Sequence, residues 1–325
     1  AFEVCDCSCF VARNERGEVV GRIAAIINKA YNNKVGEKIC RFGWMDFIDD
    51  MEVSSALVER VKQYARDHGM TRLSGPEGFL EFDALGIVVE GYDEYPTAYG
   101  KYNFPYYVQH MEKLGFEKQI DYVEFLIDVP EEIPEKYGRA AKIVAERYGL
   151  HEAPIRRHSD INRYADRVFA CMNEGYAQLH GYSQLSPGQL EDLKKQFLSN
   201  INIDYLSVIL NEKDECVGFG VCMPALNKAL QKARGHMFPF GWVHILRALT
   251  HNDTVDALLV AVTLEYRSRG VHAMIFDKIA RGLKKNGIRY IESTRELEDN
   301  NRVQNIWGPF QRRLHKRART YTMNV

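Results

Sequence analysis

A basic, glycine-containing turn offers the residue types that most directly suggest binding chemistry. The sequence Arg267-Ser-Arg-Gly270 lies between a strand-like segment and a helix-like pattern that begins at Val271. A helix N-terminus presents backbone N–H groups without intrahelical partners and carries partial positive charge. The arginines add charge, and the glycine lets a ligand approach the backbone closely. The turn therefore suits a pyrophosphate, although an ordinary strand-to-helix turn with solvated arginines is the alternative interpretation.

The elements that must position this turn occur twice in the chain. Residues 8–30 and 205–229 each predict a hairpin, because apolar residues alternate on both sides of a charged turn. The second strand of each hairpin is entered through a Val-Gly pair, Val20-Gly21 in one and Val217-Gly218 in the other, and both segments end in Asn-Lys-Ala.

A helix and then a strand follow each hairpin in the same order. Apolar residues fall on one helical stripe after Glu52 and again after Gly270. Both helices are expected to stop at a glycine, Gly69 or Gly287, which can take the left-handed conformation after a helix end. The repeated order predicts two copies of one α/β (α+β) domain, each a mixed, mostly antiparallel sheet flanked by helices.

The two copies are unequal. The later copy has additional residues before its hairpin, including a helix predicted at Pro187 with Ser186 as its N-cap. The earlier copy has almost nothing there, and the chain begins at Ala1 rather than Met, so we expect a truncated N-terminal domain. A proline-bearing linker and a helix over 135–148 separate the copies. We place the boundary near Val129. The resulting domains are residues 1–129 and 130–325.

Composition narrows the class of protein. The chain has 325 residues, a formal net charge of −1 and a pI near 6.9, which gives no general attraction to nucleic acid or an anionic membrane. No apolar run approaches the roughly 18 residues of a membrane span. We therefore expect a cytoplasmic protein with no DNA and no membrane partner. Cys5, Cys7 and Cys9 share one strand face, but no Cys/His pair with metal spacing follows, so we expect no metal site.

The order of these elements resembles the Gcn5-related N-acetyltransferase (GNAT) superfamily in a tandem arrangement. The resemblance rests on the strand at 258–264, the basic turn, and Glu298-Asp-Asn-Asn301 after the next strand. It implies an N-acyltransferase that takes acetyl-CoA or another acyl-CoA as co-substrate. One departure is His272, which stands where the family usually has Gly or Ala. Its larger side chain is expected to narrow the space for the pyrophosphate at the turn. The residues implied for the coenzyme are Tyr266, Arg267, Arg269, Gly270, Val271, His272, Ala273, Asn300 and Asn301.

The earlier copy lacks the basic turn. At the equivalent place it has Asp49-Asp50-Met51-Glu52, whose carboxylates favour a helix start but repel pyrophosphate. We therefore expect only the C-terminal copy to bind coenzyme A. The N-terminal copy is then a degenerate domain with a structural or substrate-shaping role.

Acyl transfer to an amine also needs a base that accepts a proton. The candidates are Glu265, after the central strand, and Glu292, on the next strand; a solvated carboxylate beside Arg267 and an outward-facing strand residue are the respective alternatives. The tyrosine that the family often uses as general acid is replaced by Trp307, and Tyr321 is a distant substitute.

Three further segments carry alternatives. Asn300 and Asn301 would contact the pantetheine or acceptor, or simply cap a helix. The basic run 311–319 would meet a coenzyme 3′-phosphate or RNA, or form a solvated strand face. The aromatic segment 99–107 would line an acceptor pocket between the domains, or pack within a loop.

We expect the acceptor to be a small-molecule or peptide amine, and a homodimer is an option that the sequence leaves open. Two other functions stay open as well. Tandem domains of this type also resemble transferases that use aminoacyl-tRNA to build peptidoglycan bridges. A non-catalytic ligand-binding or scaffolding protein of the same fold is the alternative from a different class.

Overall fold

The computed structural model describes residues 4–80, 82–198, 201–308 and 310–325. The N-terminal half contains β1 (Cys5–Arg13), β2 (Val19–Asn28), α1 (Lys29–Val35), β3 (Ile39–Phe47), α2 (Met51–Asp67), β4 (Arg72–Gly75), β5 (Ile87–Glu90), α3 (Tyr106–Lys113) and β6 (Glu117–Asp128). The C-terminal half contains α4 (Glu135–Tyr148), β7 (His151–Glu152), α5 (Ile161–Tyr176), α6 (Pro187–Phe197), β8 (Leu206–Leu210), β9 (Cys216–Pro224), α7 (Asn227–Ala233), α8 (Gly241–Thr250), β10 (Thr254–Val262), α9 (Val271–Lys285), β11 (Tyr290–Ser293), β12 (Glu296–Leu297), α10 (Asn301–Ile306) and β13 (Arg312–Asn324).

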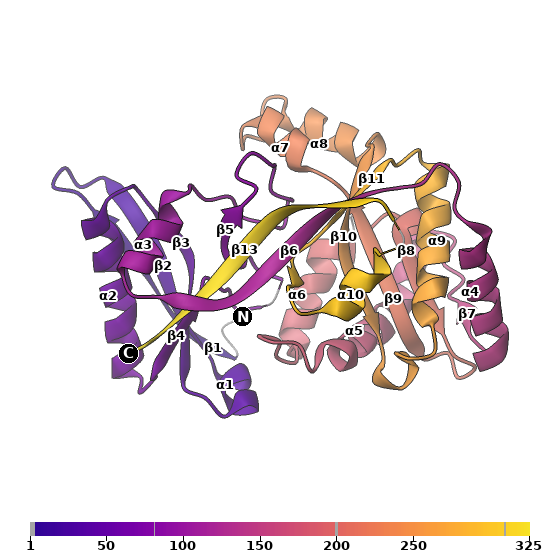
Figure 1. Ribbon diagram of the computed structural model, residues 1–325, viewed down its shortest axis with the longest axis horizontal. Coiled ribbons are helices and arrows are strands. Elements are labelled where there is room, and N and C mark those ends of the chain that lie inside the picture. Colours follow the sequence, from indigo (N-terminus) through magenta and orange to yellow (C-terminus); the bar gives the residue numbers. More distant parts are fainter. Residues whose placement is uncertain (1–3, 81, 199–200, 309) are drawn as a thin grey trace.

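One continuous sheet runs through both halves, in the order β1-β2-β3-β4-β13-β6-β11-β10-β9-β8-β7 (Figure 1). Two recorded strand pairs are parallel, β3 with β4 and β10 with β11, and the others are antiparallel. These two pairs occupy the same place in each copy of the repeat. The prediction of mixed, mostly antiparallel sheets flanked by helices is therefore confirmed.

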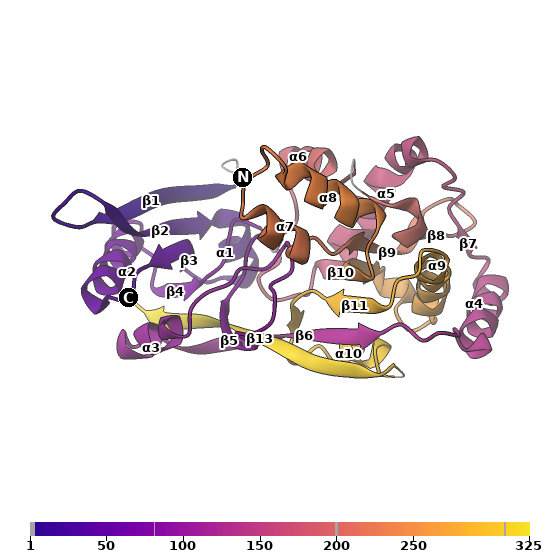
Figure 2. The ribbon, with the colours of Figure 1, turned by 90° about the horizontal axis from the view of Figure 1, so that it is seen from above.

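The two halves are joined by β6 and β13, which lie side by side across the middle of the molecule (Figures 1 and 2). The last strand of the chain, β13, lies between β4 and β6 and so completes the sheet of the N-terminal half. A domain boundary at Val129 stays a prediction. The helices on either side of Val129 pack on different halves of the molecule, whereas the strands β6 and β13 belong to the sheet of both halves.

Apolar side chains form a core on each face of the sheet in the C-terminal half. On one face α9 packs through Val271, Ile275 and Ile279 against the sheet, with α4 outside it. On the other face α5 and α6 cover β8, β9 and β10 through residues such as Ile161 and Leu193. In the N-terminal half α2 packs on the sheet in a separate core. No helix among the described residues is long and apolar enough to cross a membrane.

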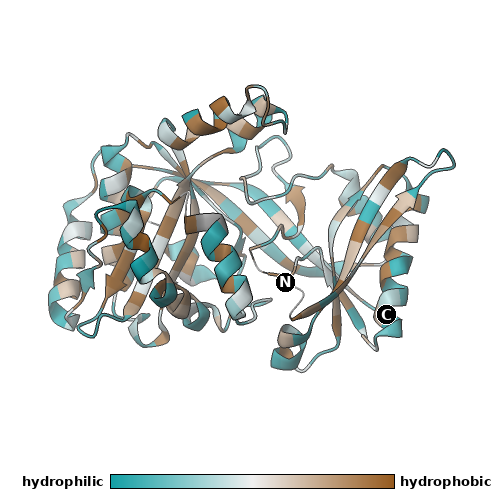
Figure 3. Cartoon of the chain, turned by 180° about the vertical axis from the view of Figure 1, so that it is seen from behind, coloured by the Kyte–Doolittle hydropathy of each residue, from teal (hydrophilic) through white to brown (hydrophobic). Residues whose placement is uncertain are grey.

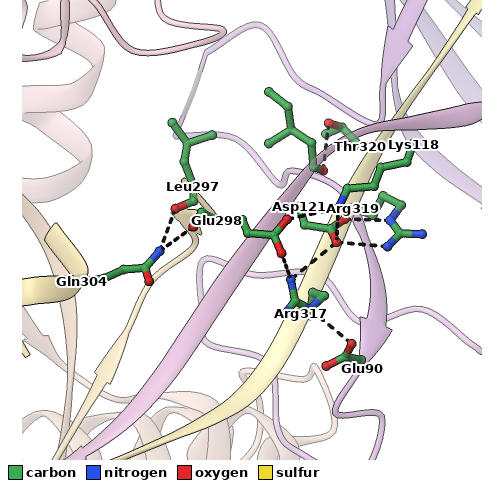
Figure 4. Close-up of polar contacts among 10 residues, drawn as sticks. Glu90, Lys118, Asp121, Leu297, Glu298, Gln304, Arg317, Arg319 and Thr320 are labelled. Carbon is green, nitrogen blue, oxygen red and sulfur yellow. Dashed lines mark hydrogen bonds and ion pairs between the residues drawn. The ribbon is translucent and has the colours of Figure 1, made fainter. Parts of the chain in front are cut away.

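The basic run 311–319 forms most of β13, and its charges face acidic partners within the protein. Asp121 on β6 accepts hydrogen bonds from Arg319 at 2.7 Å (Nε to Oδ1) and is also contacted by Arg317 (Figure 4). Arg313 pairs with Glu94, and Lys316 pairs with acidic residues described below. Most of these charges are balanced internally, whereas the exposed Arg312 donates to the Gln304 carbonyl, and a contact of the run with RNA or a coenzyme phosphate stays a prediction.

Candidate functional site

The sheet opens between β10 and β11. These parallel strands pair only from Thr254 to Ala257, opposite Tyr290 to Ser293, whereas β10 continues to Val262 against β9 alone. Thr294 turns the chain away there, and its backbone N–H and hydroxyl both donate to the Ala257 carbonyl. A gap therefore separates the second half of β10 from the chain that follows β11.

A bulge lies at the start of this gap. The register of β10 against β9 shifts between Ala257 and Leu259, so that Leu258 is the extra residue. The extra residue of a bulge is left without a ladder partner. Leu258 also lines the cavity described next, and its backbone N–H is therefore a candidate donor to a ligand in the gap.

A cavity of about 340 Å³ occupies the gap and reaches both faces of the sheet. On one face it is lined by Phe276 and Ala280 of α9, and on the other by Tyr164 and Met172 of α5. Its volume lies within the range of roughly 300–1,000 Å³ typical of small-molecule sites. Most of its lining side chains are apolar, which suits a ligand with a hydrocarbon part. Thr97, Tyr99 and Gly100 also line it, so part of the aromatic segment 99–107 does lie at the cavity.

The basic turn lies between β10 and α9. Gly270 adopts a left-handed φ of +77°, and a Cβ there would lie 3.2 Å from Cγ2 of Val144 on α4. Arg267 donates to the Gly175 carbonyl at the end of α5. Arg269 pairs with Glu265 at 2.9 Å, and its guanidinium lies 4.6 Å from the ring centroid of Tyr266. Both arginines thus have intramolecular partners close to the helix start.

The other coenzyme candidates are placed as follows. Val271 and Ala273 point into the core, and His272 is exposed on the first turn of α9. Asn300 caps α10 by accepting from the Val303 N–H at 3.4 Å, and it also lines the cavity. The capping and ligand-contact interpretations of Asn300 are therefore compatible. Asn301 is the exposed first residue of α10.

The two predicted catalytic bases lie away from the cavity lining. Glu265 is exposed and paired with Arg269. Glu292 is 3% exposed and contacts Lys316. Neither is among the described residues that line the cavity, and their catalytic roles stay predictions. Tyr321 lies in the core of the N-terminal half.

Glu292 belongs to a buried polar row on the face of the sheet opposite α9. Register places Asp256 beside Glu292, and Glu124 opposite Lys316. The Lys316 Nζ lies 2.7 Å from Glu124 Oε2 and 2.5 Å from Glu292 Oε1. Glu124, Glu292 and His315 have atoms close enough to share a metal ion, but the Lys316 ammonium already contacts both carboxylates. Burial, and then the charge of Glu292, raise the pKa of Asp256 to about 8.

Glu296 is one of four described carboxyl-bearing residues that line the cavity, with Asp83, Asp128 and Asp277, and sequence reasoning missed it. Glu296, on β12, accepts a hydrogen bond from the Trp307 indole Nε1 at 2.8 Å. Its other oxygen, Oε2, is buried and has no hydrogen-bond partner among the described residues. Burial raises the pKa of Glu296 to about 7, against the lowering effect of the Trp307 hydrogen bond. A carboxyl group that titrates near neutral pH inside a cavity is suited to proton transfer.

The sequence of the chain is similar to those of two known bacterial proteins. No model of a known protein family matches the chain. Protein YghO of Escherichia coli strain K12 is 24% identical over 318 residues, which cover 95% of this chain and 80% of that protein. A bacterial ceramide synthase of Caulobacter vibrioides is 27% identical over 235 residues, which cover 71% of this chain and 59% of that protein.

A solved structure shows the same arrangement of elements. It is a tandem GNAT protein from the clavulanic acid biosynthesis pathway, with a TM-score of 0.52 at 13% identity. The match covers 99% of this chain and 83% of that one. At this identity the likeness concerns the fold. The chain has the fold of the tandem GNAT proteins, as its repeated order of hairpin, helix and strand predicted.

Proposed function

We propose that the protein transfers an acyl group from an acyl-CoA to the amine of a long-chain, lipid-like acceptor. The observation that carries the proposal is the apolar cavity at the opening between β10 and β11, which holds both a bulged backbone and the Glu296 carboxyl group. The basic turn and α9 lie in the C-terminal half, which also supplies most of the cavity lining.

The donor would enter along the opening. The helix start at Gly270 and the adjacent arginines suit the pyrophosphate, and the side chains of Arg267 and Arg269 would exchange their intramolecular partners for phosphate oxygens. The pantetheine arm would follow the edge of β10 beyond Ala257, where that edge has no β11 partner. Asn300, at the cavity wall, would face the arm.

The chemistry follows from the groups at the gap. The acceptor nitrogen attacks the thioester carbonyl carbon, a C–N bond forms, and the C–S bond breaks to release the coenzyme thiolate. A backbone N–H at the Leu258 bulge would stabilise the developing oxyanion. The carboxylate form of Glu296 would accept the proton that the amine loses, directly or through water. The thiolate leaves without an enzyme acid, because a thiol pKa is only about 8.5.

The acceptor class is inferred from the cavity and from one relative. Apolar side chains of α5, α6 and β8, such as Val168, Leu193 and Val208, line the cavity away from the basic turn. The relative named a bacterial ceramide synthase, although this chain spans only 59% of it, points to the same acceptor class. A ceramide is a fatty-acyl amide of a long-chain amino alcohol, which combines an amine acceptor with a hydrocarbon chain that would fill such a cavity.

The test is an acyl transfer assay with the whole chain. Acetyl-CoA and a long-chain acyl-CoA would each be combined with a long-chain amino alcohol, a short amino alcohol and a peptide amine, and thiol release and amide mass would be followed. We expect amide formation with the long-chain amine to exceed that with the short amine. Thiol release that never exceeds the hydrolysis background, with coenzyme binding confirmed by calorimetry, would contradict the proposal and favour a binding protein.

A further inference from the structure

The hairpin of α7 and α8 exposes an unusual number of large apolar side chains. Phe238 is 82% exposed, Phe240 is 70% exposed, and Met237 and Leu246 are each 52% exposed. Figure 3 shows the brown colouring of this hairpin at the top of the molecule. Exposed apolar patches of this kind mark interaction surfaces rather than ordinary solvent-facing surface.

The apolar face of α8 points away from its own support. Trp242, Val243 and Leu246 recur at helical spacing and are exposed, whereas the residues between them are half-buried against α7. Hydrophobic residues on a surface helix usually face the core. On α8 the half-buried side also carries apolar residues such as Ile245 and Leu249, but Trp242, Val243 and Leu246 are left exposed, so this second apolar face fits a partner outside the chain.

The hairpin holds these side chains in place. A Cβ at Gly241 would lie 1.7 Å from the His236 carbonyl oxygen, so the chain folds back on itself closely at the start of α8. The Trp242 indole donates to the Pro239 carbonyl at 2.9 Å. At the base, the Asn252 amide donates to the Ala225 carbonyl at 2.6 Å and ties the end of the hairpin to its beginning. The apolar tip is thus a built feature of the fold.

The charge of the hairpin has one sign. Residues 227–251 contain four Lys and Arg side chains and no Asp or Glu. Lys232, Arg234 and Arg247 have no ion pair recorded among the described residues. A helix with Trp, Phe and Leu beside Lys and Arg is typical of segments that lie in a membrane interface. The whole-chain net charge, on which the expectation of no membrane partner was based, averages over this local excess.

The hairpin connects two strands of the cavity. It leaves β9, whose Val221 and Cys222 line the cavity, and returns to β10, whose Ala257 lines it as well. At its root the Asn227 amide donates to Glu292 Oε2 at 3.4 Å. In Figures 1 and 2 the hairpin lies beyond the end of these strands and on the outside of the molecule. A surface bound by the hairpin would therefore lie near the cavity.

We propose that the α7–α8 hairpin docks the protein on an anionic lipid bilayer, with Phe238 and Phe240 inserted at the level of the headgroups and the basic side chains on the lipid phosphates. The ten residues of α8 span about 15 Å, half of the roughly 30 Å hydrocarbon thickness, so the helix lies in the interface. The single-sign charge around the apolar tip favours an anionic bilayer over a second copy of the chain, whose matching hairpin would repel it. Docking would present the cavity to acceptors that reside in the membrane, and this last step rests on the proposed function.

The test is flotation of the whole protein with vesicles. We expect binding to vesicles of phosphatidylglycerol mixed with phosphatidylcholine, weak binding to phosphatidylcholine alone, and loss of binding as salt is raised. The double variant Phe238→Ser/Phe240→Ser should lower the partition coefficient at least roughly tenfold. Ile143→Ser on α4, where the side chain is 61% exposed, is the matched control and should bind as the unchanged protein does.

Three results separate this proposal from others. Equal vesicle binding by the double variant and the control, or no binding to anionic vesicles at low salt, would overturn it. A self-association equilibrium that the double variant abolishes, without vesicle binding, would assign the surface to a second copy and overturn the lipid partner. Vesicle binding without acyl transfer would leave this proposal standing while the proposed function fails. Transfer to a short, water-soluble amine should be equal in the double variant and the control, because neither change touches the cavity.

Discussion

Glu296 offers the sharpest test of the chemistry, and the change to make is Glu296→Gln. Glutamine keeps the shape and can still accept from the Trp307 indole, but it cannot take a proton from the amine. Removal of a general base typically lowers kcat by roughly 10²–10⁴-fold. With a pKa of about 7 for Glu296, the fraction of carboxylate rises about tenfold between roughly pH 6 and pH 8. The rate of the unchanged protein should follow this rise.

The assay is thiol release from acyl-CoA at saturating amine, measured across this pH range. Glu296→Gln should lower kcat and flatten the rising limb. Trp307→Phe is the matched probe, because the indole hydrogen bond lowers the Glu296 pKa and its loss should move the limb to higher pH. A Glu296→Gln variant that keeps both its kcat and its pH limb would refute the assignment of Glu296 as the base.

The same substitution has a signature in stability that does not depend on activity. The folded pKa of Glu296 is raised from 4.5 to about 7, so folding favours the protonated form. Stability is then lost as pH rises from about 4.5 to about 7, by about 3 kcal/mol. Glu296→Gln should reduce this loss in denaturant unfolding. An unchanged pH dependence of unfolding would mean that the carboxyl group is not buried as described.

Further changes test the surroundings of the site. Arg269→Gln should weaken coenzyme A binding roughly ten- to a hundredfold in calorimetry with little change in Tm, whereas Gly270→Ala should cost about 1–2 kcal/mol of stability even without ligand, because its φ of +77° disfavours a side chain and Val144 lies close. Asp256→Asn should make the free energy of unfolding less dependent on pH. The pKa of Asp256 is raised from 3.8 to about 8, so the unchanged protein should lose on the order of 5 kcal/mol of stability between about pH 4 and pH 8. The same pH dependence of denaturant unfolding in the variant and the unchanged protein would contradict this. The isolated fragment 130–325 should fail to fold by circular dichroism, because it lacks β6, which pairs with β11, β12 and β13.

Local features of the fold could be predicted from the sequence because their signals are local. The helix expected over 135–148 is α4, and Ser186 caps α6 by accepting from the Gln189 N–H. Gly69 and Gly287 have φ of +69° and +68°, as expected after each helix. In each case the deciding atoms lie within a few residues of one another, and the side-chain types express the backbone conformation directly.

The position of β13 could not be predicted in the same way. Alternation identifies a strand but not its neighbours, and nothing near residue 312 indicates that the strand will lie between β4 and β6. The basic run was therefore interpreted as a surface, although Arg319 meets Asp121 and Lys316 meets Glu124 across the sheet. The pairing residues are separated by well over a hundred positions, so their charges look unbalanced in the sequence.

The same limit explains why the sequence suggested Glu292, and not Glu296, as a candidate catalytic base. Both are carboxylates near the end of the central parallel pair, and strand position alone favours Glu292. Sheet register and the fold of α10 distinguish them. Burial raises the pKa of Glu292, and the buried Lys316 that Glu292 contacts lowers it only in part. Glu296 is held by neutral groups, the Trp307 indole at 2.8 Å from Oε1 and the Ser293 side chain. A carboxylate held by an ammonium is committed to that ion pair, whereas one held by an indole can still exchange a proton. Of the two, we therefore expect Glu296, which lines the cavity, to act as the base.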